Sequence, residues 1–293
     1  MKNIKNKNDF IIGTAQLGQK YGIANSSNLN SKYLAQKFIE EAINLGFNSF
    51  DTAASYGNSE SLIGYGVKNA NHNLKVYTKI PKLKTKNILE AQEKLEQSLK
   101  KLRLSSIEGL LIHNPDDWKT KGMNEFALEL RNSKVINKFG LSIYDKKQIP
   151  NNELIDLIQV PGNIFNQKLI SSKELVDFNK QGGTVIIRSI FIQGLLFLKE
   201  EKIPKSLLPL LEPINKFKNL ANISNISMQS LAIRTVQSIC PFGKIIIGCD
   251  NVKQLKALSK ITDESINKDI LDEAIDLGRK YPSNLWDPRS WNI

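Results

Sequence analysis

The sequence predicts an α/β fold, a closed (β/α)8 TIM barrel that forms a single domain. Short apolar segments recur about eight times along the 293 residues, and most of them precede a stretch with apolar residues at helical spacing. No linker or change in composition divides the chain, so residues 1–293 are expected to form one unit. The competing architecture, an open doubly wound sheet, would need a glycine-rich phosphate fingerprint after its first strand. The segment GTAQLG at that place has its glycines at the wrong spacing.

The predicted strands are short and alternate with helices. The segment IEGLLIH is almost continuously apolar, which is typical of a parallel strand buried on both faces. The first helix is expected to open at Ser31 and to end at Gly46, and Ser59, or Asn58 before it, is expected to cap the next. The loop 16–30 reads as a surface connection. Strands are expected at 10–15, 47–51, 74–80, 107–113, 139–143, 155–160, 184–190 and 244–248, with further helices at about 88–102, 173–181, 205–219, 227–239, 251–260 and 264–280.

Composition and charge argue against several classes of function. A hydrophobic content of 41% and a charged content of 24% are those of a soluble globular protein. The net charge of +12 invites a nucleic-acid or membrane partner, but the lysines are scattered among acidic residues, so neither is expected. No signal peptide and no run of about 18 apolar residues is seen. Cys240 and Cys249 are too few for a disulfide framework or a zinc site, which favours a reduced, cytoplasmic setting.

Four polar side chains stand at, or just after, the ends of three successive predicted strands. Asp51 ends the second strand, Tyr56 follows it in the loop, Lys79 lies at the end of the third and His113 at the end of the fourth. Catalytic residues of such barrels come from this end of the strands, so the four are expected to meet there. Each alone has a structural explanation, such as a carboxylate that binds loop amides. Together they predict a catalytic site.

The acidities of these groups indicate the chemistry. A free tyrosine has a pKa of about 10, which a neighbouring ammonium lowers. Lys79 is the candidate neighbour, and Asp51 is expected to pair with it and keep it charged. His113 is expected to bind and orient the substrate oxygen. The set predicts that Tyr56 is a general acid for an oxygen that gains negative charge, as a carbonyl does when it receives hydride, and no metal is required.

At these residues the sequence resembles the aldo-keto reductase family. The resemblance covers nearly the whole chain, through GTAQLG, FDTAASYGNSESLIG, YTKI around Lys79, LLIHNPDD around His113, GLS, and IIIGCDNVKQL near the end. It implies a (β/α)8 barrel that uses NADPH, with the nicotinamide across the barrel mouth. All four positions of the family's Asp, Tyr, Lys and His tetrad are matched. The resemblance makes Tyr56 the proton donor.

The resemblance also implies where the nicotinamide lies. Ser142 and Gln159 match positions that hold its carboxamide. Arg188 and Ser189 stand where an aromatic residue and a serine often occur, and the aromatic residue normally stacks on the nicotinamide. Arg188 is expected to stack there instead, with Phe191 as the alternative and a structural role for Arg188 as another.

For the adenosine end, the resemblance points to the last strand. Gly248 leads into a helix that starts near Asn251, whose free amide groups suit an anion. Gln254 matches a residue near the adenosine ribose. Asp250 and Asn251, however, replace the basic or hydroxyl residues that commonly grip the 2′-phosphate. NADP(H) is therefore the expected cofactor, with NAD(H) left open.

The substrate is expected to be a small-molecule carbonyl compound. Trp118 is expected to wall the pocket, with packing on the barrel rim as the alternative. The loops around 16–30, 114–122 and 192–204 should shape the pocket, and their polar residues allow a sugar-derived carbonyl. The sequence thus predicts an NAD(P)H-dependent reductase of aldehydes or ketones. The alternative is a non-catalytic nucleotide-binding or regulatory barrel, and the sequence gives no sign of an oligomeric state.

Overall fold

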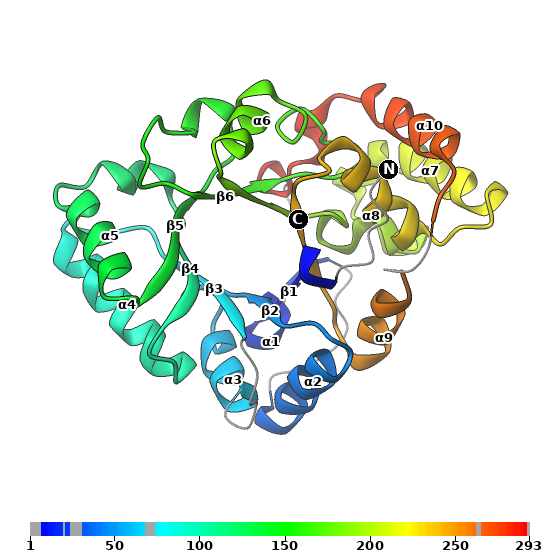
Figure 1. Cartoon of the computed structure of the whole chain (residues 1–293). Coiled ribbons are helices and arrows are strands. Elements are labelled where there is room, and N and C mark those ends of the chain that lie inside the picture. The colour runs from blue at the N-terminus through cyan, green and yellow to red at the C-terminus, as the bar shows by residue number, and fades with distance from the viewer. Residues whose placement is uncertain (1–6, 20, 24–30, 68–73, 262–264, 292–293) are drawn as a thin grey trace.

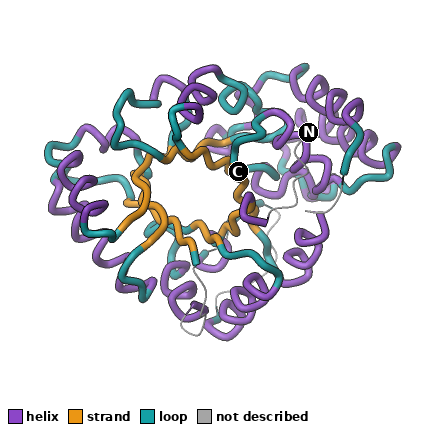
Figure 2. Tube along the Cα trace, in the orientation of Figure 1, coloured by secondary structure: helices purple, strands orange, loops and turns teal. Residues whose placement is uncertain are grey.

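Eight parallel strands close into one barrel in the order of the sequence, which confirms the predicted fold class. In the computed structural model, which describes residues 7–19, 21–23, 31–67, 74–261 and 265–291, β8 pairs with β1 and so closes the ring. Figure 2 shows the strands as an inner ring with the helices outside it. The strands are β1 Phe10–Gly13, β2 Ser49–Asp51, β3 Lys75–Ile80, β4 Ile107–Ile112, β5 Ile136–Ser142, β6 Leu157–Pro161, β7 Thr184–Arg188 and β8 Lys244–Gly248.

The helices surround the barrel and carry most of the crossovers (Figure 1). Between β5 and β6 the fully described segment holds only a 3-10 turn at Lys146–Gln148, whereas β7 and β8 are joined through two helices. The helices are α1 Ala15–Gly18, α2 Lys32–Asn44, α3 Ser59–Gly66, α4 Ile88–Leu102, α5 Met123–Asn132, α6 Lys173–Lys180, α7 Leu211–Ile223, α8 Met228–Ile239, α9 Val252–Ile261 and α10 Lys268–Arg279. Short 3-10 segments include Pro115–Lys119, Ile192–Phe197, Ser283–Trp286 and Pro288–Ser290.

Helix α2 illustrates how local sequence sets an element. The hydroxyl of Ser31 accepts a hydrogen bond from the amide of Leu34 at 3.2 Å and so caps the helix. Ala35, Phe38 and Ala42 are fully buried against the barrel. The chain leaves the helix through Gly46 at φ +87°, a left-handed conformation that favours glycine. Both predicted ends of this helix are confirmed.

Several predicted boundaries were wrong. Of the predicted surface loop 16–30, residues 20 and 24–30 lie outside the described residues, whereas Gln16 and Leu17 belong to α1 and are buried. β5 begins at Ile136, three residues before the predicted start, because Ile136 pairs with Ile107. α5 was not predicted at all. Its N-cap is Gly122, which lacks the side-chain oxygen that marks most helix starts.

Apolar side chains fill both the inside of the barrel and the layer under its helices. The inside is packed by residues from five strands, and Tyr77 lies among them fully buried. A second cluster lies beneath α7, α8, α10 and the C-terminal segment, where Trp286 stacks on Phe165 at a centroid distance of 3.9 Å. The filled interior leaves the carboxyl ends of the strands as the face that carries the site. The interior residues are Ile11, Tyr77, Leu111, Leu157 and Ile186.

The two cysteines, Cys240 and Cys249, are free and buried. Burial raises the pKa of each thiol to about 12. Among the described helices, none is long and apolar enough to cross a membrane. The described residues also contain no group of three or more His, Cys, Asp or Glu side chains placed to hold a metal ion.

Candidate active site

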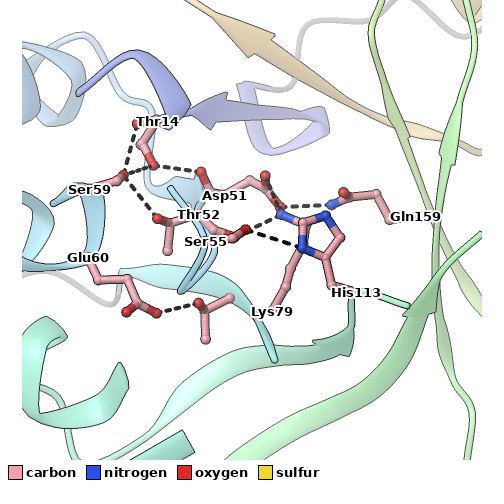
Figure 3. Close-up of polar contacts among 10 residues, drawn as sticks. Thr14, Asp51, Thr52, Ser55, Ser59, Glu60, Lys79, His113 and Gln159 are labelled. Carbon is pink, nitrogen blue, oxygen red and sulfur yellow. Dashed lines mark hydrogen bonds and ion pairs between the residues drawn. The ribbon is translucent and has the colours of Figure 1, made fainter. Parts of the chain in front are cut away.

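The polar side chains predicted at the ends of three successive strands lie close together, and a residue of β6 joins them. Asp51 ends β2, Lys79 is the next-to-last residue of β3, and His113 follows β4 directly. Gln159 reaches the same place from β6. Figure 3 shows Asp51, Lys79, His113 and Gln159 converging from these four separate strands.

Lys79 and Asp51 form a buried ion pair. The ammonium of Lys79 donates to both carboxylate oxygens of Asp51 at 2.7 Å and to the carbonyl of Thr52 at 2.8 Å. All three protons of the ammonium are therefore used. Burial lowers the pKa of Lys79, and the carboxylate of Asp51 opposes that shift. The three hydrogen bonds that the ammonium of Lys79 donates favour its charged form.

Tyr56 lies above this ion pair. Its ring centroid is 5.1 Å from the ammonium nitrogen of Lys79, and the ring of His113 meets it edge-on at 6.2 Å. Burial, followed by the charge of Asp51, raises the pKa of Tyr56 above its ordinary range, while Arg188 lowers it. The phenol consequently keeps its proton at neutral pH.

His113 is neutral at physiological pH. Burial lowers the pKa of its ring to about 4, and the positive charges of Lys79 and Arg188 act in the same direction. The hydroxyl of Ser55 lies 3.4 Å from Nδ1. A serine proton donated to Nδ1 leaves the ring proton on Nε2. A neutral imidazole in that form is a hydrogen-bond donor without a net charge.

A set of buried hydroxyl groups holds the loop that carries Tyr56. Ser59, at the start of α3, bonds the hydroxyls of Thr14 at 2.8 Å and Thr52 at 3.0 Å (Figure 3). Ser59 also donates to the carbonyl of Thr14 at 2.9 Å. Asn58 is the N-cap residue of α3, but its side chain makes no capping hydrogen bond, and Ser59 is already the first residue of the helix. Neither of the two residues predicted to cap this helix therefore caps it with its side chain. The first residues of α3 instead tie together the ends of β1 and β2.

Two glycines bring the loop after β1 against the loop of Tyr56. A Cβ atom on Gly18 would lie 1.8 Å from the carbonyl oxygen of Tyr56. A Cβ on Gly57, whose φ is +55°, would lie 2.3 Å from the carbonyl oxygen of Gly18. Only a residue without a side chain fits either position. The close approach fixes the backbone at Tyr56.

Ser142 and Gln159 present unpaired polar atoms side by side. They are partners in the register of β5 and β6. The amide nitrogen of Gln159 donates to Asp51 at 2.8 Å, which leaves its Oε1 without a hydrogen-bond partner in the described part of the chain. The hydroxyl of Ser142 is likewise buried and unpartnered there. One acceptor next to one hydroxyl matches the donor and acceptor of a primary carboxamide, such as that of nicotinamide.

A cavity of about 1040 Å³ runs from Tyr56 past the ends of β7 and β8. Arg188, Ser189 and Gly248, for which the sequence predicts cofactor contacts, line it. Ser189 has φ +66°, and the two residues Ile192 and Gln193 nearby also have positive φ. Such backbone is costly for residues other than glycine and tends to gather at functional sites. This volume is that of a site for a small molecule or a cofactor.

Arg188 stacks on a residue of the protein itself. Its guanidinium carbon lies 4.4 Å from the centroid of Tyr144, and that of Arg289 lies 3.4 Å from the same ring. Tyr144 follows β5 by two residues, and Arg289 belongs to the C-terminal segment. Phe191, the predicted alternative, packs edge-on against Phe197 at 5.0 Å and lines the cavity.

The two residues predicted at the adenosine end are engaged in starting α9. Oδ1 of Asn251 accepts from the amide of Gln254 at 2.9 Å. Oε1 of Gln254 accepts from the amide of Asp250 at 2.8 Å. Gln254 lines the cavity, whereas Asn251 is not among its lining residues. Both side chains therefore have a capping role that the sequence interpretation did not assign to them.

Trp118 is not brought into the cavity. Its ring packs on Phe139 at a centroid distance of 5.8 Å and lies against the main core.

Sequence reasoning missed three residues at or near the cavity: Tyr21, which lines it, and Tyr144 and Arg289, which lie beside Arg188. Tyr21 lines the cavity and lies 6.5 Å from the ring of Tyr56. Its place three residues after GTAQLG was the available signal.

Comparison with known proteins agrees with this geometry. A family model described as the aldo/keto reductase family matches residues 9–274. A methylglyoxal reductase of Escherichia coli is 37% identical over 99 residues, which are 31% of this chain and 35% of that protein. The matched stretch thus spans about a third of that relative's length.

Solved structures share the fold at low identity. The holo form of an aldo-keto reductase from Bacillus halodurans has a TM-score of 0.74 and 18% identity, covering 93% of this chain and 91% of that one. An aldo/keto reductase from Klebsiella pneumoniae, in complex with NADP and acetate, has a TM-score of 0.71 and 17% identity, covering 94% and 91%. Because the family model matches nearly the whole chain, the chain belongs to the aldo/keto reductase family of oxidoreductases.

Proposed function

We propose that the protein reduces the carbonyl group of an aldehyde or ketone to an alcohol, with NADPH as the reductant, in the cytoplasm. The observation that carries the proposal is the buried Asp51–Lys79 pair beneath a protonated Tyr56. The two free, buried cysteines suit a reducing compartment. The bound cofactor would supply hydride to the carbonyl carbon.

Tyr56 donates its proton to the carbonyl oxygen as that oxygen gains negative charge. The raised pKa of the phenol keeps the proton available at neutral pH. The ammonium of Lys79, 5.1 Å from the ring centroid, stabilises the negative charge that develops on the phenol after transfer. Asp51 positions Lys79, and neutral His113 donates a hydrogen bond to the carbonyl oxygen.

The chain's own polar atoms support a nicotinamide at this place. Gln159 Oε1, which has no partner in the described chain, would accept from the carboxamide nitrogen, and the unpartnered hydroxyl of Ser142 would donate to the carboxamide oxygen. Asp51, which accepts a hydrogen bond from Gln159, lines the cavity together with Ser189 and Gly248. Gln254 also lines this cavity, and Asn251 fixes the start of α9 beside it.

The preference for NADPH has separate support. Three lysines, Lys199, Lys202 and Lys260, line the outer part of the cavity, and they favour a ligand that carries an extra phosphate. Lys256 is less available to bind a phosphate, because its ammonium pairs with the carboxylate of Glu41 at 3.1 Å. The dissociation constants of NADPH and NADH, measured by calorimetry, decide this point. A constant for NADPH no smaller than that for NADH rejects the preference.

The enzyme activity is tested with the purified chain, NADPH, and a panel of aldehydes, ketones and sugars. We expect Tyr56→Phe to lower kcat by about 10²- to 10⁴-fold while NADPH binding stays unchanged, because the phenol acts only on the reacting oxygen. Tyr33→Phe, at an exposed tyrosine, is the matched control and should behave as wild type. Full turnover by Tyr56→Phe contradicts the proposal. Tight cofactor binding without any turnover favours the regulatory barrel.

A further inference from the structure

The guanidinium of Arg188 is a donor without an acceptor. Its Nη2 is buried and has no hydrogen-bond partner among the described residues. No described carboxylate forms an ion pair with it. Its guanidinium lies on the face of Tyr144, and its charge lowers the pKa of Asp287, which is already bound by Arg289. Burying part of a cation with an unused donor is unfavourable unless a ligand completes it. Arg188 lines the same cavity as Tyr56.

The neighbouring charges are already compensated. Lys79 is neutralised by Asp51, and Tyr56 and His113 carry no charge at neutral pH. Arg289 binds both carboxylate oxygens of Asp287 through its guanidinium. In the described part of the site, Arg188 therefore leaves the cavity beside Tyr56 with an excess positive charge.

The position of Arg188 suits its guanidinium to bind an anion through its N–H groups. Tyr144 lies between two guanidinium groups, with Arg188 at 4.4 Å and Arg289 at 3.4 Å from its centroid. The ring of Tyr144 covers one face of the Arg188 guanidinium, and Nη2 at its edge has no hydrogen-bond partner among the described residues. A guanidinium edge matches two oxygens of a carboxylate or a phosphate.

The nicotinamide is a poor candidate for this partner. Its carboxamide is already matched by Ser142 and Gln159, whose unpaired atoms are one hydroxyl and one acceptor. A nicotinamide ring also becomes cationic when it gives up hydride, and a neighbouring guanidinium repels that charge. The remaining ligand of the cavity near Tyr56 is the substrate.

We propose that Arg188 binds an anionic group of the substrate, so that the enzyme acts on carbonyl compounds that bear a carboxylate or a phosphate. This inference rests on the proposed carbonyl reduction. Hydride adds to the carbonyl carbon, the C–O π bond breaks, and the oxygen takes the proton of Tyr56. The carboxylate or phosphate stays ionised throughout and leaves with the hydroxy product.

Matched substrate pairs test the proposal with the full chain and NADPH. One pair is 4-oxobutanoate and its methyl ester, and the other is glyceraldehyde 3-phosphate and glyceraldehyde. We expect kcat/KM for the preferred anion to exceed that of its neutral partner by at least about tenfold. The pair with the larger ratio identifies carboxylate or phosphate as the natural group. Equal or lower values for both anions overturn the proposal.

Variants assign the preference to Arg188. Arg188→Gln should lower kcat/KM for the anion by about 10²-fold, mainly through KM, and by at least about tenfold more than for the neutral partner. Arg188→Lys should restore part of the preference, because it keeps the charge without the planar fork. Arg279→Gln, at an exposed arginine paired with Asp276, is the control and should change neither value. An equal loss for anion and neutral partner overturns the proposal.

Binding measurements separate the inference from the proposed function. Calorimetry on the complex with NADP should detect 4-hydroxybutanoate or inorganic phosphate with wild type and at least about tenfold weaker binding with Arg188→Gln. NADPH should bind both proteins alike, and an equal loss of NADPH affinity would assign Arg188 to the cofactor instead. Anion binding without reduction of any carbonyl rejects the proposed function but keeps the anion site. Reduction of neutral carbonyls without anion binding rejects the anion site alone.

Discussion

Gln159 donates from Nε2 to Oδ1 of Asp51 at 2.8 Å, and the same oxygen accepts from Lys79 at 2.7 Å. The carboxylate thereby fixes which way the amide of Gln159 faces, because its oxygen would be repelled by Asp51. The Oε1 atom must point away from the ion pair and remain available. The buried charges thus prepare the place where a carboxamide is expected to bind.

Replacing Gln159 should affect both stability and cofactor binding. Gln159→Leu removes a hydrogen bond to a charged group, which costs about 1.5–3 kcal/mol of unfolding free energy. It also removes the acceptor for the carboxamide, so NADPH should bind about tenfold more weakly. Urea unfolding and calorimetry measure the two effects. Unchanged stability would show that Asp51 does not depend on this bond.

Replacing its neighbour Ser142 should separate the two effects. The hydroxyl of Ser142 is buried and unpartnered in the described chain, so Ser142→Ala should leave the unfolding free energy unchanged or raise it by about 1 kcal/mol. NADPH should nevertheless bind about three- to tenfold more weakly. A loss of stability with unchanged cofactor affinity would assign this hydroxyl to the fold.

Breaking the ion pair from one side should be more costly than removing both charges. Lys79→Met leaves Asp51 buried without its cation, which should cost about 3–5 kcal/mol of unfolding free energy. Adding Asp51→Asn should recover part of that loss. Lys268→Met, at an exposed pair with Asp272, is the control and should cost less than about 1 kcal/mol. Additive effects of the two substitutions would mean that the charges are not coupled.

Stability should fall in mild acid because of His113. Its pKa is about 4 in the folded protein and 6.5 in the unfolded chain, so above pH 6.5 neither state is protonated. Below pH 6.5 the unfolded state gains the proton first, and stability drops until pH 4 by at most about 1.4 kcal/mol per pH unit.

Urea unfolding between pH 7 and pH 4 measures this loss. His113→Gln should flatten the profile, because the titrating group is gone. His72→Gln is the control, since His72 is the other of the two histidines and lies outside the described residues. Equal slopes for wild type and His113→Gln would refute the assignment.

The sequence predicted the barrel and the catalytic set because both depend on local patterns. Apolar runs mark each strand, and Asp51, Lys79 and His113 stand where those runs stop. The capping role of Asn251 was also readable, since an Asn three residues before a Gln at a helix start is a capping pattern.

Other features depend on contacts between distant segments. Arg289 reaches Tyr144 only because the C-terminal segment is anchored by Trp286, which stacks on Phe165. The hydrogen-bond partners of Lys79 include a backbone carbonyl, that of Thr52, which no side-chain pattern reveals. Sequence patterns name the residues of a site, but the direction of each donor is set by tertiary packing.

The close fit between Gly18 and Gly57 bears on engineering of this barrel. Each glycine occupies space against the other loop's backbone, so the two loops have matched surfaces. A designer who grafts a foreign loop after β1 alone would bring a side chain into the backbone of Tyr56. The two loops should therefore be treated as one unit. A library of variants designed to change substrate specificity should exchange residues 14–19 and 52–59 together.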